Sequence, residues 1–93
     1  MKDIILIDVG TGNLRSVQKA LEFVGAAVER TDDPRKVLAA KKVVLPGVGA
    51  FGDFMSGLKA RRLDDAIKEI AQRNIPLLGI CVGMQALFEI GEE

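Results

Sequence analysis

The sequence predicts an α/β protein built on a four-stranded parallel sheet. Three observations support this fold class. The 93 residues suffice for one small domain, and their composition, 48% hydrophobic and 28% charged, is ordinary for a globular chain. Four apolar runs have the length of strands. A segment with helical spacing follows each run, and this alternation favours right-handed crossovers between parallel strands. No linker divides residues 1–93, so we expect a single domain.

The first strand–helix repeat occupies the N-terminal quarter of the chain. Ile4–Ile7 is an unbroken apolar run, which is typical of a strand covered on both faces. Gly10–Asn13 reads as a turn. Apolar residues then recur at helical spacing, and Gly25 should end this helix. The apolar positions are Leu14, Val17, Leu21 and Val24.

The second repeat and the third strand follow directly. Ala26–Arg30 predicts a weaker strand. Asp33 followed by Pro34 is the signature of a helix start, with Asp33 as N-cap, and this short helix should run to about Ala39. Lys42–Leu45 predicts the third strand.

Two helical segments precede the fourth strand. The first should begin near Asp53 and the second after Arg62. In the second, acid-first pairs four residues apart indicate a solvated face opposite an apolar one. Asn74 suits a left-handed helix cap, and Pro76 should open the strand. The pairs are Asp64 with Lys68 and Glu69 with Arg73; the apolar face comprises Leu63, Ala66, Ile67, Ile70 and Ala71.

Strand order decides which loops meet. We expect the flavodoxin-like order 2-1-3-4, in three layers, as a (βα)4 unit. In that order the loops after strands one, three and four lie side by side at the carboxyl edge of the sheet. Asn13, the Pro46–Gly52 loop and Cys81 would then share one surface.

The fourth strand runs into the pattern Gly-x-Cys-x-Gly, formed by Gly79, Cys81 and Gly83. Small residues at the flanks permit a sharp strand-to-helix turn that exposes a nucleophile, because a Cβ there would collide. Cys81 would precede a helix beginning near Val82 and ending at Gly91, and the helix N-terminus favours a thiolate. The alternative is a buried structural cysteine.

A thiolate attacking an amide needs N–H donors for the oxyanion. The N–H of Val82 is one candidate, and the N–H of Val48 or Gly49 in the glycine-rich loop is another. We expect the glycines of this loop to serve a close approach rather than packing. A tight turn or a phosphate-binding nest is an equally good interpretation of the loop. Gly10 and Gly12 match the first two glycines of the dinucleotide-binding fingerprint Gly-x-Gly-x-x-Gly. The position of its third glycine is occupied by Arg15, so the match fails.

Charge and composition argue against several functions. Thirteen basic residues balance 13 acidic ones, so nothing indicates nucleic-acid binding. The apolar runs are too short to span a membrane and no signal-like segment is evident, so we expect a cytoplasmic protein. One cysteine allows no internal disulfide. With no histidine we expect no metal and no cofactor, and the thiol lacks the partner that commonly activates it.

Three motifs together resemble a known family. Gly79–Gln85, Leu45–Phe51 and Asp8–Ser16 are similar in sequence and order to those of class I (triad) glutamine amidotransferases. The Met-Gln pair after the cysteine and the Gly-Asn-Leu segment are most similar to the glutaminase subunit of imidazole glycerol phosphate synthase, an enzyme of histidine biosynthesis. The resemblance covers the whole chain.

This resemblance implies hydrolysis of glutamine through a thioester on Cys81, with the ammonia delivered to a cyclase subunit. It assigns Gly49 and Gln85 to substrate binding, and the N–H groups of Val48 and Val82 to the oxyanion hole. Asn13 matches a residue near the face that contacts the cyclase subunit. Val9 stands where the family more commonly has an aromatic residue.

Family members are roughly twice as long, and the His and Glu of their triad lie in the later half. We therefore expect the N-terminal (βα)4 part of a glutaminase, inactive by itself. Two alternatives stay open: a flavodoxin-like phosphate-binding module in which Cys81 is incidental, and a purely structural fragment. Pro76–Cys81 would present an unpaired edge carrying Leu77, Leu78 and Ile80, so we also expect self-association.

Overall fold

The computed structural model of this chain describes residues 3–10, 14–47 and 51–92. Strands and helices alternate, except that two helices separate the last two strands. The strands are β1 (Ile4–Ile7), β2 (Val28–Thr31), β3 (Val43–Gly47) and β4 (Leu77–Cys81). The helices are α1 (Arg15–Phe23), α2 (Pro34–Leu38), α3 (Phe51–Ala60), α4 (Leu63–Gln72) and α5 (Val82–Glu92).

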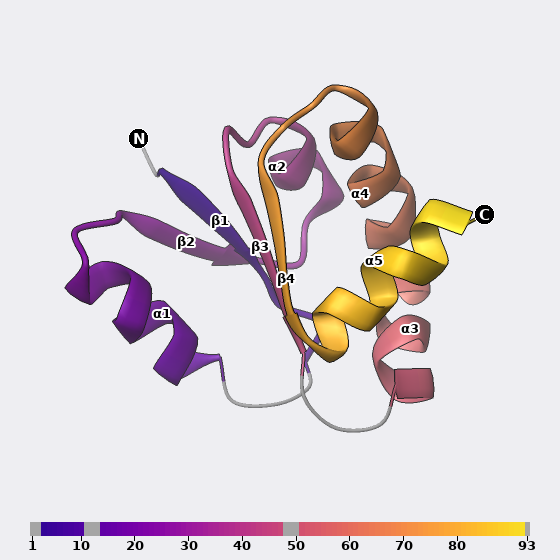
Figure 1. Cartoon of the computed structure of the whole chain (residues 1–93), viewed down its shortest axis with the longest axis horizontal. Helices are drawn as coiled ribbons and strands as arrows, with labels where there is room; N and C mark the ends of the chain where they lie inside the picture. The colour runs from indigo at the N-terminus through magenta and orange to yellow at the C-terminus, as the bar shows by residue number, and fades with distance from the viewer. Residues whose placement is uncertain (1–2, 11–13, 48–50, 93) are drawn as a thin grey trace.

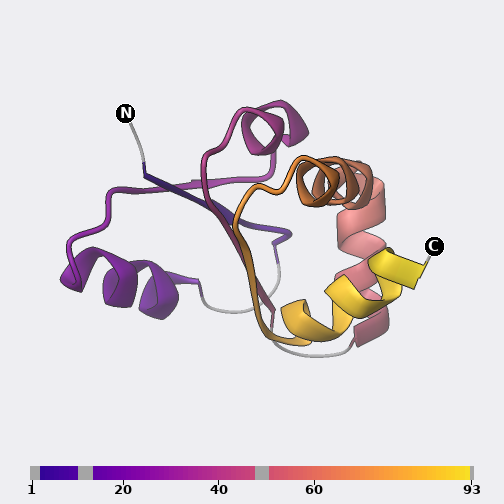
Figure 2. The ribbon, with the colours of Figure 1, turned by 45° about the horizontal axis from the view of Figure 1, so that its top comes forward.

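The strands form one parallel sheet in the order β2-β1-β3-β4. The predicted flavodoxin-like order is thereby confirmed. Figure 1 shows α1 on one face of the sheet, with α2, α3, α4 and α5 on the other. The tilted view of Figure 2 shows the same separation into three layers. The carboxyl ends of β1, β3 and β4 consequently meet at one edge.

The residues predicted to start and to end helices do so in the structure. The Asp33 carboxylate accepts a hydrogen bond from the N–H of Arg35 at 2.9 Å, and Pro34 is the first residue of α2. Gly25 follows α1 with φ of +97°, and Asn74 follows α4 with φ of +60°. Both adopt the left-handed conformation that terminates helices. These predictions are confirmed.

Several predicted boundaries are wrong. The second strand, expected over Ala26–Arg30, spans Val28–Thr31, and the third and fourth strands begin one residue after the expected Lys42 and Pro76. The third strand does not end at Leu45 but continues to Gly47, because β4 pairs alongside it as far as Cys81. β1 pairs with β3 only up to Val44. Pro46, which has no N–H, therefore lies beyond the β1–β3 ladder and removes no hydrogen bond from it. The helix expected near Asp53 begins at Phe51. Gly91 does not stop the last helix, which runs to Glu92.

The two faces of the sheet carry separate apolar clusters. The larger cluster lies under α2 to α5 and includes β-strand residues that alternate with those of the smaller one. The smaller cluster lies under α1 and contains Leu6, Leu14, Val28 and Val44. Ile5, Leu6 and Ile7 are all buried, which confirms that the first strand is covered on both faces.

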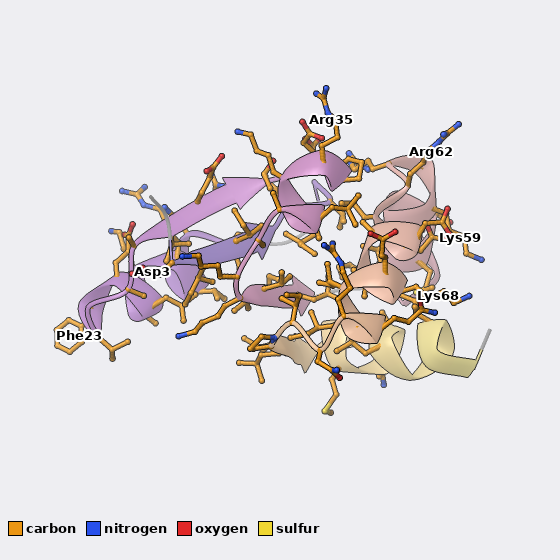
Figure 3. The ribbon with its side chains drawn as sticks, turned by 90° about the horizontal axis from the view of Figure 1, so that it is seen from above. Asp3, Phe23, Arg35, Lys59, Arg62 and Lys68 are labelled. Atoms are coloured by element: carbon orange, nitrogen blue, oxygen red, sulfur yellow. The ribbon has the colours of Figure 1, made fainter. Side chains whose placement is uncertain are left out.

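The end of α1 departs from the predicted helical stripe. Val24 falls after the last helical residue and is 77% exposed, because the chain turns away at Gly25. Phe23, beside it, is 90% exposed and projects from the end of the helix (Figure 3). Leu14 is buried, and Val17 and Leu21 are half-buried against the smaller cluster.

Candidate functional site

Cys81 occupies the corner between the last strand and the last helix. It is the final residue of β4, paired in register with Gly47 of β3, and α5 begins at the next residue, Val82. Its backbone is described, whereas its thiol lies outside the described part of the structure. A residue at this point stands at the carboxyl edge of the sheet and directly before a helix N-terminus. This placement agrees with the predicted strand-to-helix turn.

The glycine after Cys81 lies against the backbone of β3. A Cβ built on Gly83 would lie 1.9 Å from the carbonyl oxygen of Leu45, far inside van der Waals contact. That oxygen belongs to the central part of the sheet and cannot shift without breaking strand pairing. Only glycine therefore allows the first turn of α5 to approach the sheet this closely.

The glycine before Cys81 lies under the same helix. A Cβ on Gly79 would meet the backbone N of Met84 at 2.9 Å, its Cα at 2.8 Å, and the side chain of Leu87 at 2.7 Å. Both glycines that flank Cys81 are thus required by contact between β4, β3 and α5. The predicted collisions at these two positions are confirmed, while the role of Cys81 as a nucleophile stays a prediction.

Gly47 has a packing role that the sequence did not suggest. We expected the glycines of residues 46–52 to be free of packing, but a Cβ on Gly47 would lie 2.9 Å from the Phe54 ring and 3.0 Å from the N of Gly83. Phe54 is 1% exposed. Gly47, Phe54 and Gly83 therefore pack together beneath the corner that carries Cys81. The expectation holds better for Gly52, where a Cβ would meet nothing within 4 Å.

The remaining predicted site residues divide into two groups. Gln85 lies in the first turns of α5 with its side chain exposed, and Val82 is the first residue of that helix. Asn13, Val48 and Gly49 lie outside the described residues, so their assignment to the cyclase-facing surface, the oxyanion hole and substrate binding stays a prediction. The strands that lead towards them do end at one edge, as the topology requires.

Two ion pairs, which sequence reasoning missed, lie near the neighbouring ends of β1 and β2. The Asp8 carboxylate accepts a hydrogen bond from the N–H of Gly10 at 2.8 Å and pairs with Arg30 at 3.7 Å. Arg61, at the end of α3, pairs with Asp32 at 3.5 Å. The partners of each ion pair are far apart in sequence, so no local pattern could have revealed the pairs. The Arg61–Asp32 pair joins the residue after α3 to the segment that follows β2.

Val9 lies beneath α3 at this same edge. Val9 is 4% exposed. A Cβ added to Gly57 of α3 would lie 3.3 Å from the Cβ of Val9. Arg61 donates a hydrogen bond to the Gly57 carbonyl oxygen at 3.2 Å. The compact valine thus fits under a closely packed helix.

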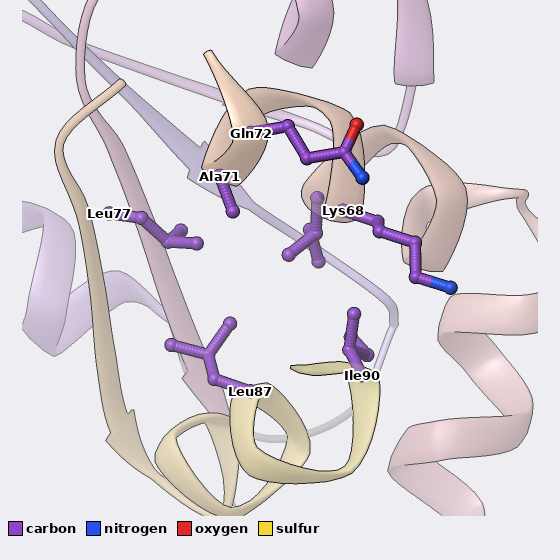
Figure 4. A pocket seen from close by; sticks show the side chains of 7 residues that line it. Lys68, Ala71, Gln72, Leu77, Leu87 and Ile90 are labelled. Atoms are coloured by element: carbon purple, nitrogen blue, oxygen red, sulfur yellow. The ribbon is translucent and has the colours of Figure 1, made fainter. Parts of the chain in front are cut away.

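A groove of about 340 Å³ opens at the opposite end of β4 (Figure 4). It runs between α4 and α5, with Lys68 and Gln72 beside an otherwise apolar lining. Because Leu77 begins the strand that Cys81 ends, the groove is separate from the corner described above. Its lining consists of Ile67, Lys68, Ala71, Gln72, Leu77, Leu87 and Ile90.

The part of the chain that the structure describes contains no group of three or more histidine, cysteine, aspartate or glutamate residues arranged to hold a metal ion. Nor does any helix in these segments combine the length and apolar character needed to cross a membrane.

Comparison with known proteins decides the family. Residues 5–92 match the family described as glutamine amidotransferase class-I. The chain belongs to this family. The match includes the Gly-x-Cys-x-Gly corner and all four strands of the sheet. The family resemblance expected from the three sequence motifs is therefore confirmed.

This amidotransferase chain is similar to proteins named imidazole glycerol phosphate synthase subunit HisH. It is 56% identical to that of Moorella thermoacetica over 93 residues, which are 100% of this chain and 44% of the relative. It is 54% identical to that of Corynebacterium diphtheriae over 93 residues, again 100% and 44%. For Dehalococcoides mccartyi strain CBDB1 the identity is 53% over 90 residues, 97% and 44%. The chain spans less than half the length of these relatives and corresponds to their N-terminal part.

Proposed function

We propose that this chain supplies the nucleophile-bearing segment of a glutaminase that provides ammonia for imidazole glycerol phosphate synthesis in histidine biosynthesis. The observation that carries the proposal is the closed corner at Cys81, where Gly83 lies against the Leu45 carbonyl oxygen. So close an approach brings a helix N-terminus directly behind the cysteine. The family description supports glutamine as the substrate, and the names of relatives that are more than half identical support a role in imidazole glycerol phosphate synthesis.

In the proposed reaction the Cys81 thiolate attacks the side-chain amide carbon of glutamine. The N–H of Val82, with that of Val48 or Gly49, stabilises the oxyanion that forms. Collapse of this intermediate breaks the C–N bond, and the nitrogen leaves as ammonia after taking up a proton. Water then attacks the thioester carbon, which releases glutamate and restores the thiol. Gly49 and Gln85 hold the glutamine.

Proton transfer in this sequence needs a general base and acid. The 93 residues contain no histidine, and the chain covers only 44% of its relatives. We therefore propose that the base comes from a segment beyond the one described, and that this chain alone has no appreciable turnover. Loss of general acid–base catalysis typically costs about 10²–10⁴ in rate. Release of ammonia from glutamine at enzymatic rates, abolished in Cys81→Ser, would contradict this.

The partners follow from the same proposal. Asn13 would contribute to the face that docks a cyclase subunit, which receives the ammonia, and the complex would work in the cytoplasm. We also propose that the chain by itself associates with a second copy.

An electrophilic glutamine analogue tests the nucleophile without requiring turnover. A chloroketone analogue of glutamine should alkylate Cys81 faster than a chloroketone of similar size that lacks the amino-acid group. Excess glutamine should slow the reaction with the analogue. Mass spectrometry after proteolysis locates the label and measures its rate.

Two variants sharpen the test. Cys81→Ser should take up no label. Gln85→Ala, a change at an exposed helical position, should leave the fold intact and weaken protection by glutamine. Equal rates for both chloroketones, or protection by inorganic phosphate and not by glutamine, would refute the glutaminase assignment; the second result would favour a phosphate-binding module.

A further inference from the structure

The ring of Phe54, on α3, packs against the end of β3. It is 1% exposed and belongs to the larger apolar cluster. Its outer carbons approach Gly47, since a Cβ built on that glycine would lie 2.9 Å from Cε1 of the ring and 3.0 Å from Cζ. Gly47 is the last residue of β3 and pairs in register with Cys81. The ring therefore contacts the strand residue that lies opposite the cysteine.

The first turn of α5 reaches the same point. The Cβ position of Gly47 lies 3.0 Å from the backbone N of Gly83, so the ring, the end of β3 and the first turn of α5 meet there. Gly83 lies in turn against the carbonyl oxygen of Leu45, as described above. Phe54 thus fills the space beside the contact that joins β3 to the helix beginning directly after Cys81.

α3 holds this ring in place through a second close contact. Gly57 follows Phe54 by three residues and so shares its face of the helix. The Cβ position of Gly57 lies 3.3 Å from the Cβ of Val9, which is itself buried behind the end of β1. α3 is therefore packed closely against the chain that follows β1 as well as against the end of β3, and both contacts restrict movement of the ring.

We propose that Phe54 is a positioning residue for Cys81: by filling the space beside Gly47 and Gly83, its ring keeps the N-terminus of α5 in place directly after the cysteine. The inference rests on the proposed role of Cys81 as a nucleophile and names the side chain that maintains this role. Phe54 itself touches no reacting atom. It acts through the backbone of the two glycines.

The chemistry of a helix N-terminus explains why its position matters. Free N–H groups and the helix dipole stabilise a thiolate relative to a thiol, and this effect is confined to the first turn. Removing the ring leaves a space that the surrounding structure fills only partially, so the first turn of α5 gains freedom to move. The thiolate of Cys81 is then less favoured, and its alkylation requires a higher pH.

An ordinary core residue would not have this effect, and Leu58 provides the comparison. Leu58 lies one turn after Phe54, is 0% exposed and belongs to the same cluster, but none of the atoms nearest the Cβ position of Gly47 belongs to it. Phe54→Leu removes only Cε1, Cε2 and Cζ, which include both ring carbons that approach Gly47. Leu58→Ala removes the same number of carbon atoms from the cluster. The two substitutions match in size and differ in what they touch.

Alkylation by iodoacetamide, followed across pH, tests the proposal, because Cys81 is the only cysteine in the chain. Phe54→Leu should raise the midpoint of the pH profile by about one pH unit. A thiolate of higher pKa is more nucleophilic, so the rate should be about threefold lower below the midpoint and about threefold higher on the alkaline plateau. Leu58→Ala should keep the midpoint of the unchanged chain. Greater access to the thiol would instead raise the rate at every pH and leave the midpoint unchanged.

An unchanged midpoint in Phe54→Leu, or an equal shift in Leu58→Ala, would overturn the proposal. Circular dichroism establishes that each variant is folded over the pH range used. If Phe54→Leu does not fold, Phe54→Met fills more of the same space and should move the midpoint in the same direction, whereas Leu58→Met should not; no shift in Phe54→Met would then refute the proposal.

Iodoacetamide also separates this proposal from the glutaminase assignment, because its reaction does not require recognition of glutamine. A midpoint shift in Phe54→Leu, found in a chain whose labelling by the chloroketone glutamine does not slow, would support the positioning role and refute the glutaminase. Protection by glutamine together with identical pH profiles in Phe54→Leu and the unchanged chain would refute the positioning role and leave the glutaminase supported.

Discussion

The two faces of the sheet are covered very differently, and adjacent residues of β4 show the consequence. Leu77 points towards α4 and α5 and is half-buried against the larger cluster. Leu78 points to the face of α1 and is 56% exposed. The two residues are chemically identical, so the helices that cover each face, and not hydrophobicity, determine their burial.

The helices themselves account for this difference. α4 buries Leu63, Ala66, Ile67 and Ile70 in the larger cluster, whereas no residue within α1 is fully buried. α1 covers β1 and β2, and β4 lies at the opposite edge (Figure 1). Stability should therefore depend mainly on the face formed by α2 to α5.

The largest effect should come from Gly83→Ala, which forces α5 off the covered face. The added methyl group would lie 1.9 Å from the Leu45 carbonyl oxygen, and neither backbone can yield locally. We expect a loss of more than about 4 kcal/mol, which a small domain with a stability of about 5 kcal/mol barely survives. Urea unfolding followed by circular dichroism should show a transition shifted to very low urea concentration.

Gly52→Ala provides the control for that change. It replaces a glycine in α3 that has open space around its Cβ position, and should stabilise the chain by about 0.5–1 kcal/mol. If both variants unfold at the same urea concentration, the close approach of α5 to the sheet is not what requires glycine at residue 83.

A pair of leucine truncations measures the two faces directly. Leu58→Ala removes a fully buried side chain of α3, and should lower the free energy of unfolding by about 3–4 kcal/mol. Leu21→Ala removes a half-buried side chain from α1 and should cost about 1 kcal/mol. Both free energies of unfolding come from urea titrations at neutral pH. Equal losses would mean that α1 contributes as much to the fold as the other face does.

The smallest effect concerns pH and the start of α2. Hydrogen bonds from the side chain and backbone of Arg35 hold the pKa of Asp33 below its ordinary value of 3.8. A carboxyl group whose pKa is lower in the folded state stabilises the fold above its unfolded pKa, and this contribution disappears as pH falls through the folded value. Asp33→Asn should therefore reduce the loss of stability on acidification below about pH 4.

The effect should be smaller than that of Leu21→Ala, because this capping site is open to solvent. Comparing urea midpoints of the two proteins at neutral and acidic pH measures it. An identical dependence on pH in both would show that Asp33 contributes nothing through its charge.

Several features of this protein follow from the sequence alone because their causes are local. Asp33 with Pro34 starts a helix, and Gly25 and Asn74 end helices, through groups within a few residues. The alternation of strands and helices was enough to predict the parallel sheet, whereas the strand order was adopted by analogy with flavodoxin-like folds and is confirmed by the structure. Gly79 and Gly83 could be recognised as necessary because a strand that enters a helix directly leaves no space for a Cβ.

Other features depended on contacts between residues distant in the chain, and only the tertiary structure decided them. Gly47 packs against Gly83, and Arg61 pairs with Asp32, across separations that no periodicity encodes. Pro46 extends β3 because a later strand lies beside it and the first strand has already ended. The exposure of Leu78 likewise reflects which helices reach its face of the sheet, and this depends on the packing of the whole chain.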